Sequence, residues 1–455
     1  MRLKIKAITL SLVVIAMAAA TAASAAKREA VEHLDLKSTY VDKIDYKGLT
    51  KCAVKDYGVK SDGSAQSEAM QRALDDISAQ GGGILKLPAG EYSFNGLFLR
   101  SNVHLVISGG ATLHLTRPKS ADGNSKKGRS IGAIFTLAAS SDRNSAEYIE
   151  NCSIRGERGE QYTIDYSEYN NGYSTRFVIA NMVKNFMIAD AKILDNYTTH
   201  CGIIFVSSYA EGADKWEIYR PTDGEIRNCA IYHADLGYGL CQLHGAERLY
   251  FEDIFSNGGM TLRMETGAGG TYGGIFDIQA RNVSSHQSKA SVMMSPHVYD
   301  NGTVRIDGVR AESSFAAVLI YRGCILNGRT YEPDARFGTF DAKSEIINIH
   351  AVYGEDAQVS TREIFVCEPR EGIYDKFREN TFGCKRAFVV GPSGAVVFNN
   401  AEGDYSVSCR NISGEGFGEY NDKVIYVEDI MDRYKARWAI ERKCAYSKLR
   451  RADGD

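Results

Sequence analysis

The chain has 455 residues, a formal net charge of −3 and only seven prolines. The weak negative charge argues against a general nucleic-acid-binding protein, because such a protein carries a strongly basic surface. Ten cysteines occur without a Cys-x-x-Cys pair, so no zinc site of that type is indicated. This length also exceeds that of a typical single globular domain, unless the architecture is a repeat that grows in one dimension.

Residues 1–25 are typical of a secretory signal peptide. Arg2, Lys4 and Lys6 precede an apolar run from Ile8 to Ala20, and residues 23–25 have the A-x-A pattern of a cleavage site. The apolar run is short for a helix that spans a membrane. We therefore expect a secreted protein, extracellular or periplasmic, without a membrane anchor, and a polar linker over residues 26–50.

The following segment predicts an N-terminal cap and the first strands. Ser67 is a suitable N-cap for a helix that runs to about Ala79, and a Gly-Gly-Gly sequence ends this helix. Four apolar residues form one stripe of it: Met70, Ala73, Leu74 and Ile77. Short strands are expected at Ile84–Leu87, Gly96–Leu99, Val103–Ile107 and Thr112–Leu115. A stack of strands needs such a cap, because an exposed apolar end would aggregate.

Beyond Ala133 a short unit recurs, in which two apolar residues flank two mostly polar ones. It occurs at Ile149–Cys152, Ile188–Ala191, Ile226–Cys229, Phe251–Ile254, Ala280–Val283 and Ile306–Val309. The last four units begin 25, 29 and 26 residues apart, and periods of this size indicate a solenoid. The units are rich in Ile, Val, Phe and Gly, which favours stacked strands over helical repeats.

We therefore predict an all-β protein, a right-handed parallel β-helix of the pectin-lyase-like type with an N-terminal capping helix. The β-helix with its catalytic groove is expected over residues 51–324. Later coils with an inserted lid are expected over residues 325–410, and a C-terminal cap or tail over residues 411–455.

The candidate site lies in two strand-like runs, Leu240–His244 and Thr261–Glu265. On adjacent parallel rungs, about 4.8 Å apart, the side chains of Gln242 and Glu265 can meet. Glu265 is the candidate general acid, since partial burial beside Leu262 and Met264 would raise its pKa. From residue type alone, a surface ion pair between Glu265 and Arg263 is the competing interpretation.

Four segments of the chain resemble the iota-carrageenase family, glycoside hydrolase family 82: residues 177–205, the Gln242-x-His244 strand, TLRMETG at 261–267 and residues 291–309. Its members are secreted β-helix hydrolases that cut β-1,4 linkages of a sulfated galactan with inversion. The resemblance implies that Glu265 is the proton donor and that Gln242 helps to hold a chloride ion and a water. It also implies bound calcium or sodium, although no loop here has a convincing run of calcium ligands.

One position departs from the family pattern. Well-known members have an aspartate two residues after the acid as general base, and this chain has Gly267. By coil position the candidate replacements are Asp300, Asp235 and Glu247.

The expected substrate is a sulfated galactan, bound by an endo-acting enzyme that is a monomer. Arginine binds sulfate oxygens in a bidentate manner, which makes Arg263, Arg305 and Arg322 candidate substrate ligands. His244 and His297 are further candidates, because imidazoles bind sugar hydroxyls or sulfates.

Three other functions remain open. A polygalacturonase-type hydrolase is disfavoured because its NTD, paired-Asp, GHG and RIK signatures are missing at the expected coils. A polysaccharide lyase would need a calcium cluster or a basic residue placed to abstract a proton, and neither stands out. A non-catalytic binder that retained the groove is the third, because Gly267 replaces the expected base.

Overall fold

The computed structural model describes residues 32–117, 130–141, 147–209, 218–267, 273–325, 336–360, 363–366, 373–379 and 388–430. The chain divides into two compact units, Met1–Leu34 and Asp35–Asp455, and all elements belong to the second. The predicted signal peptide lies outside the described residues, as does the tail after Ile430.

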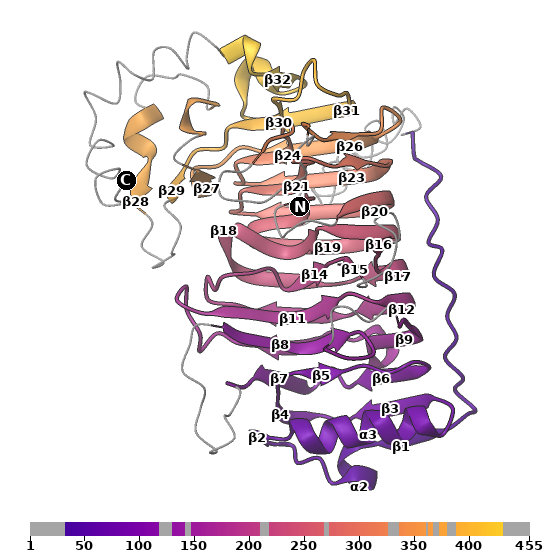
Figure 1. The fold of residues 1–455 in the computed structure, drawn as a ribbon. Helices are drawn as coiled ribbons and strands as arrows, with labels where there is room; N and C mark the ends of the chain where they lie inside the picture. Colours follow the sequence, from indigo (N-terminus) through magenta and orange to yellow (C-terminus); the bar gives the residue numbers. More distant parts are fainter. Residues whose placement is uncertain are drawn as a thin grey trace, which may run out of the picture. The chain divides into compact units, whose positions relative to one another are not determined.

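The second unit is a parallel β-helix whose coils stack from the N-terminal end upward in Figure 1. Its large sheet joins 25 of the described strands, and their pairings within that sheet are parallel and follow three ladders. The ladder that we call sheet I contains β5 (Leu97–Phe98), β8 (Ser130–Leu137), β11 (Ser174–Ala180), β14 (Ile203–Phe205), β21 (Ala290–Ser295), β24 (Ala316–Ile320), β30 (Ala395–Asn399) and β32 (Val424–Tyr426).

The other two ladders complete each coil. Sheet II begins with β1 (Thr50–Cys52), β3 (Gly83–Leu87), β6 (Val103–Ile107), β9 (Ile149–Gly156), β12 (Val183–Ala189) and β17 (Thr222–Arg227). Sheet III begins with β2 (Asp62–Ala65), β4 (Gly90–Phe94), β7 (Ala111–Leu115), β10 (Tyr162–Asp165) and β13 (Ala191–Leu194).

Long strands then turn corners and serve more than one ladder. They are β18 (Ala230–Leu243), β19 (Gly245–Glu265), β20 (Gly274–His286), β23 (Val304–Glu312), β26 (Glu345–Val352) and β31 (Ser408–Glu415). The parallel β-helix prediction is confirmed, and its coils continue through to Tyr426. The remaining described strand pairs are small: β15 (Ser208–Tyr209) with β16 (Ile218–Tyr219), and β22 (Asp300–Asn301) with β25 (Thr339–Phe340).

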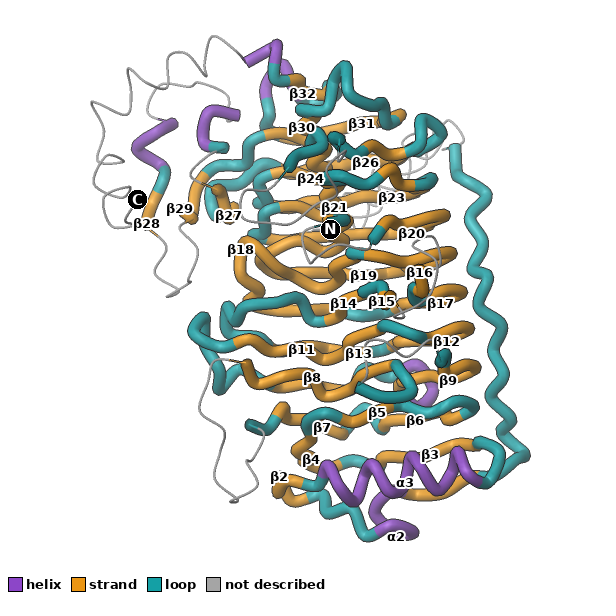
Figure 2. Tube along the Cα trace, in the orientation of Figure 1, coloured by secondary structure: helices purple, strands orange, loops and turns teal. Residues whose placement is uncertain are grey.

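The cap over the first coils contains α2 (Ala53–Tyr57) and α3 (Ser67–Ala79), drawn in purple in Figure 2. The predicted stripe of α3 is fully buried, so the helix covers the apolar end of the stack. The N-cap is Gln66 instead of Ser67. The Ser67 hydroxyl accepts a hydrogen bond from the backbone N–H of Asn95 and does not cap its own helix. Short 3-10 turns occur at η1 (Glu157–Gly159) and η4 (Gly418–Tyr420).

The recurring unit marks a corner of the coil. Its third residue has a positive φ at five positions that follow one another in register: Asp190, Asn228, Asp253, Asn282 and Gly308. Asn, Asp and Gly tolerate this left-handed conformation best, and the Asn228 amide donates to the Asp190 carboxylate at 2.8 Å. The first unit, at Asn151, lies at a different corner, in register with Asn185. Asn151 and Asn185 also have positive φ, so the two corners share one backbone conformation and the same sequence unit fits both.

A small antiparallel sheet is inserted between β26 and β30. It consists of β27 (Ala357–Ser360), β29 (Phe388–Gly391) and β28 (Arg378–Glu379). In Figure 1 these three strands lie beside the upper coils. The 3-10 turns η2 (Ile364–Val366), η3 (Ile373–Lys376) and η5 (Glu428–Ile430) contribute to the same apolar cluster. This cluster buries Met293, Leu319 and Phe398, so the insert covers the outer face of the later strands of sheet I.

Residues 35–49, expected to be a linker, lie along the outside of the coils and are seen in teal beside them in Figure 2. Val41 exchanges two hydrogen bonds with the Asn185 side chain, at 2.8 and 2.9 Å. Asp42 accepts two from Arg155, at 2.7 and 3.0 Å. Farther along the stack, Lys37 donates its amide to the Gln279 side chain at 3.0 Å. We call residues 35–49 the strap.

The strap predicts a difference between two of its own aspartates. Asp42→Asn removes the charge that pairs with the buried Arg155. We expect the free energy of unfolding, measured in urea, to be about 1–2 kcal/mol lower than that of the wild type. Asp35→Asn is the matched control, because its ion pair with Lys37 is about four-fifths exposed and contributes little. Equal stability of the two variants would contradict an anchoring role for Asp42.

Candidate functional site

The candidate site lies on the outer face of sheet I, where β18 and β19 end. Gln242 pairs in register with Arg263, and Leu243 with Met264. Leu243 and Met264 are fully buried in the core. Because strand side chains alternate between faces, Gln242, Arg263 and Glu265 project outward.

Glu265 is the centre of the cluster. Its Oε2 accepts a hydrogen bond from Gln242 Nε2 at 3.0 Å and forms an ion pair with Arg263. Its Oε1 lies 3.6 Å from His297 Nε2. The predicted meeting of Gln242 and Glu265 therefore occurs. Arg263 also pairs with Glu265, but as a largely buried pair and not as the surface pair of the competing interpretation.

Arg263 is 5% exposed, and a second guanidinium nitrogen donates to the Gly237 carbonyl. Its guanidinium also lies over the Tyr238 ring, 5.8 Å from the centroid. In this position Arg263 contacts Glu265 and the protein backbone, whereas we expected it to bind substrate.

The pKa of Glu265 is the opposite of the prediction. Burial raises it, as expected, but the positive charge of Arg263, followed by His297, outweighs burial and lowers the pKa well below its usual range. The carboxyl is therefore ionised in the free protein at neutral pH. The physical reason is that Arg263, two residues earlier on the same strand, is a buried cation next to the carboxylate. The apolar residues beside Glu265 in the sequence did not reveal this burial.

His297 carries the complementary charge. Burial alone lowers its pKa, but contacts with the Cys324 side chain and Glu265 outweigh it and raise the pKa to about 9. Its Nδ1 is buried without a hydrogen-bond partner. His297 is thus a protonated imidazolium next to an ionised carboxylate.

His244 follows β18 and reaches the same cluster. Its Nδ1 is 2.7 Å from the backbone carbonyl oxygen of Glu265. Since a carbonyl only accepts, Nδ1 carries the hydrogen. Burial, the largest influence, lowers the pKa of His244 to about 4, so the ring is neutral at neutral pH.

Gly267 follows the end of β19 and has a φ of +84°. A Cβ at this position would lie 3.0 Å from the Tyr299 ring and 3.3 Å from the His297 Cβ. The space that an aspartate side chain would need here is occupied by Tyr299, so the glycine and the tyrosine fit each other.

The three predicted base candidates are engaged by other groups. Glu247 lies in sheet II and pairs with Arg220 at 3.4 Å and with Arg248. Asp300 accepts from Thr339 at 2.9 Å and pairs with Arg336. Asp235 is 1% exposed and accepts from the Gly237 amide. Among the described residues, no direct contact joins any of the three carboxylates to Glu265.

The two remaining arginines differ in position. Arg305 belongs to sheet II, where it pairs with Glu345 at 3.1 Å and donates to the Asp35 carbonyl of the strap. Arg322 comes directly after Tyr321, two coils beyond Glu265, and its side chain is 55% exposed while paired with Asp404. Of the two, Arg322 closely follows β24 of sheet I, the sheet that carries the site.

A further cluster escaped the sequence analysis. Glu363 pairs with Lys289 at 3.1 Å and accepts a hydrogen bond from the Tyr321 hydroxyl. Tyr321 is two rungs from Glu265, roughly 10 Å along the stack. The insert therefore borders the site through Glu363. The coil period places Tyr321 in the strand column of Glu265, whereas nothing in the sequence signals Glu363.

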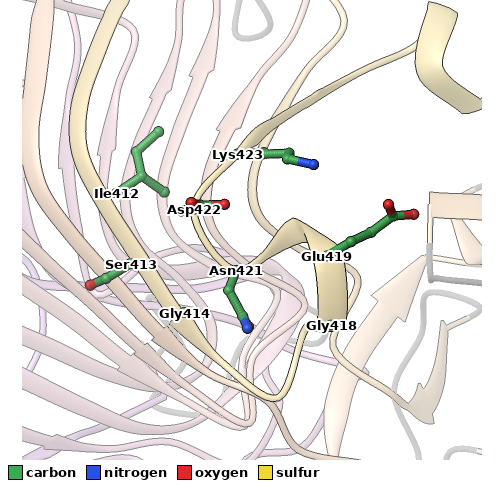
Figure 3. Close-up of a pocket in the computed structure, with 8 residues that line it drawn as sticks. All are labelled: Ile412, Ser413, Gly414, Gly418, Glu419, Asn421, Asp422 and Lys423. Atoms are coloured by element: carbon green, nitrogen blue, oxygen red, sulfur yellow. The ribbon is translucent and has the colours of Figure 1, made fainter.

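A pocket of about 570 Å³ lies elsewhere, at the last coil (Figure 3). It is lined by Ile412, Ser413, Gly414, Gly418, Glu419, Asn421, Asp422 and Lys423, none of which belongs to the cluster around Glu265. Within the described part of the chain, no helix is long and apolar enough to cross a membrane. The same residues contain no group of three His, Cys, Asp or Glu side chains placed to hold a metal ion.

Two curated proteins are similar in sequence. Over 282 residues the chain is 33% identical to an iota-carrageenase of Zobellia galactanivorans, covering 60% of this chain and 53% of that protein. Over 271 residues it is 30% identical to an iota-carrageenase of Alteromonas macleodii, covering 58% and 51%. The chain thus spans about half the length of the curated relatives it matches. No family model matches it.

Solved structures show the same fold. A 1,3-α-1,4-β-D-galactose-4-sulfate-3,6-anhydro-D-galactose-2-sulfate galactohydrolase has a TM-score of 0.74 and 23% identity, covering 88% of this chain and 95% of its own. An iota-carrageenase complexed to iota-carrageenan fragments has a TM-score of 0.72 and 22% identity, covering 87% and 95%. The resemblance to iota-carrageenases is therefore confirmed in sequence and in fold.

The raised pKa of His297 predicts a pH-dependent loss of stability. The folded state holds this proton up to about pH 9, whereas an ordinary histidine releases it near pH 6.5. The stabilisation is therefore fully present below about pH 6.5 and is lost as the pH rises through about 9. When the pH is raised from about 6 to about 9.5, we expect the free energy of unfolding of the wild type to decrease. The decrease should be on the order of 1 kcal/mol larger than that of His297→Gln.

The measurement is urea unfolding at pH 6, 7.5 and 9.5. His286→Gln is the matched control, since His286 lies on β20 beside Asn257, outside the Glu265 cluster, and should keep the wild-type pH slope. Identical slopes for wild type and His297→Gln would show that His297 is not protonated in the folded state.

Proposed function

We propose that this chain is a secreted, endo-acting and inverting glycoside hydrolase that cuts β-1,4 linkages of iota-carrageenan or a closely related sulfated galactan. The observation that carries the proposal is the contact of Gln242 with Glu265 on the outer face of sheet I. Iota-carrageenases share this fold, and one of the matching structures holds iota-carrageenan fragments. Gln242 and Glu265 are the two residues that the sequence resemblance assigns to the catalytic site.

Glu265 is proposed as the general acid, which protonates the leaving oxygen of the glycosidic bond. It must first take up a proton, because Arg263 keeps it ionised in the free protein. His297 is the protonated neighbour, 3.6 Å away, that can supply this proton. A neutral His297 beside a protonated Glu265 would then be the reactive state, favoured when bound sugar excludes water.

The substrate carries fixed negative charges, and the exposed Arg322 is the arginine best placed to meet a sulfate group. It lies two coils from Glu265, which fits contact with a sugar ring neighbouring the cleavage point. The insert borders the same face and fits the expected role of a lid.

A chloride ion near Gln242 remains a proposal. The Gln242 amide already donates to Glu265, but Arg263 Nε is buried without a hydrogen-bond partner and is a donor that suits an anion. Calcium or sodium binding is likewise an expectation from the resemblance.

A non-catalytic binder of sulfated galactan is the second candidate, because Gly267 leaves no side chain where the family places its base. A binder would retain affinity for the polymer but release no reducing ends.

The first test is release of reducing ends from iota-, kappa- and lambda-carrageenan by the purified mature protein. We expect release from iota-carrageenan, and Glu265→Gln should reduce kcat by about 10²–10⁴-fold, because an amide is too weak an acid to protonate the leaving oxygen. Glu252→Gln on the same strand, at a corner in register with Arg227 and Arg281, is the matched control and should keep wild-type activity.

Binding of iota-carrageenan without release would favour the binder. Full activity of Glu265→Gln would exclude Glu265 as the acid. A rise in absorbance near 235 nm, which marks an unsaturated product, would indicate a lyase.

A further inference from the structure

Hydrolysis with inversion needs a group that takes a proton from the attacking water, on the side opposite the acid. Gly267 has no side chain to do this, and Tyr299 fills the space beside it. The three carboxylates considered from the sequence are held by other partners, which leaves the other described groups near Glu265 as candidates for the acceptor.

His244 lies close to Glu265 and Gln242. Leu243 pairs with Met264 in register, which places His244 beside Glu265 on the neighbouring rung and on the same face as Gln242. Adjacent rungs are about 4.8 Å apart. The charged groups that act on this ring are Glu265, Arg263 and Arg176.

The orientation of the ring is fixed by its bond to the backbone. Nδ1 donates to the Glu265 carbonyl at 2.7 Å, so the lone pair of the neutral ring is on Nε2, on the far side of the imidazole. Among the described residues, the only hydrogen bond of the His244 ring is the one made by Nδ1. A base whose second nitrogen is held by a third group has the arrangement typical of catalytic histidines.

The strength of this base is suitable. A histidine with a pKa of about 4 remains neutral across the neutral pH range. Its affinity for a proton is then similar to that of an ordinary aspartate, whose pKa is about 3.9. A partly buried imidazole can therefore replace a carboxylate without a loss of basicity.

Gln242 provides the second contact for the water. Its amide nitrogen faces the Glu265 carboxylate, so its amide oxygen is the free acceptor. Two residues apart on one strand, Gln242 and His244 project in the same direction. Two acceptors side by side can hold both hydrogens of one water and leave its lone pair directed at the sugar.

We propose that His244 is the general base of this enzyme, a role that rests on the proposed hydrolase function. The oxygen of the water forms a bond to the anomeric carbon while the bond from that carbon to the glycosidic oxygen breaks. One water proton passes to His244 Nε2, and the proton of Glu265 passes to the leaving oxygen. Solvent afterwards accepts the proton from the His244 imidazolium and returns one to His297, which restores the resting pair of ionised Glu265 and protonated His297.

The decisive variant is His244→Asn, assayed by release of reducing ends from iota-carrageenan. The asparagine amide can still donate to the Glu265 carbonyl from the position of Nδ1, but it has no basic nitrogen. We expect kcat to fall about 10²–10⁴-fold with KM within about twofold of wild type. His286→Asn is the matched control and should keep wild-type kcat.

A second arm separates a base from a positioning residue. In His244→Ala, added imidazole can occupy the vacated space, and we expect it to restore activity at least tenfold over the variant alone. Circular dichroism and the melting temperature verify that both variants are folded.

Each outcome bears on one proposal. Activity of His244→Asn within tenfold of wild type would overturn the assignment of His244 and leave the hydrolase function intact. Loss of activity without restoration by imidazole would reduce His244 to a structural support of Glu265. A wild-type protein that releases no reducing ends from any carrageenan would instead refute the hydrolase function itself.

Discussion

The parallel register of β18 with β19 is the constraint on which the site depends. It pairs Gln242 with Arg263 and sends Leu243 and Met264 into the core. A shift by one residue would exchange the two faces, burying Glu265 and exposing the apolar side chains. Each of the neighbouring rungs is held in the same register, from β14 to β24. The stability of the core and the geometry of the cluster are therefore set by the same pairing.

Local patterns predicted most of the fold. The stripe of α3, the strand Val103–Ile107 and the ends of the two site strands near Gln242 and Glu265 agree with the sequence analysis, because each is set by periodicity and turn residues. Features that depend on distant contacts were harder to predict. The strap is polar, and only its contacts with Arg155 and Asn185 show that it lies along the coils. Likewise, the unit at Asn151 resembles the later ones but occupies another corner.

The site shows the same division. The strand period was enough to bring Gln242 close to Glu265, but the charge state of Glu265 depends on how deeply Arg263 is buried, which a period of two does not reveal. His297 and Glu363 arrive from later segments, and their places are decided by loops after β21 and by the insert. Sequence reasoning was thus sufficient for residues on the strands and insufficient for the electrostatics that surround them.

The low pKa of Glu265 and the raised pKa of His297 are two results of one charge arrangement. A buried guanidinium attracts the carboxylate, and the carboxylate then holds the imidazolium. Moving one proton from His297 to Glu265 neutralises both groups while leaving Arg263 charged. With the site open to water this transfer is unfavourable. Exclusion of water by a bound polymer would weaken the solvation of both charges and so reduce the free-energy cost of the transfer. The same exclusion would keep His244 neutral, because burial is already the main reason for its low pKa. In the proposed mechanism, a single change in solvation on binding thus favours a Glu265 that holds its proton and a His244 that has none.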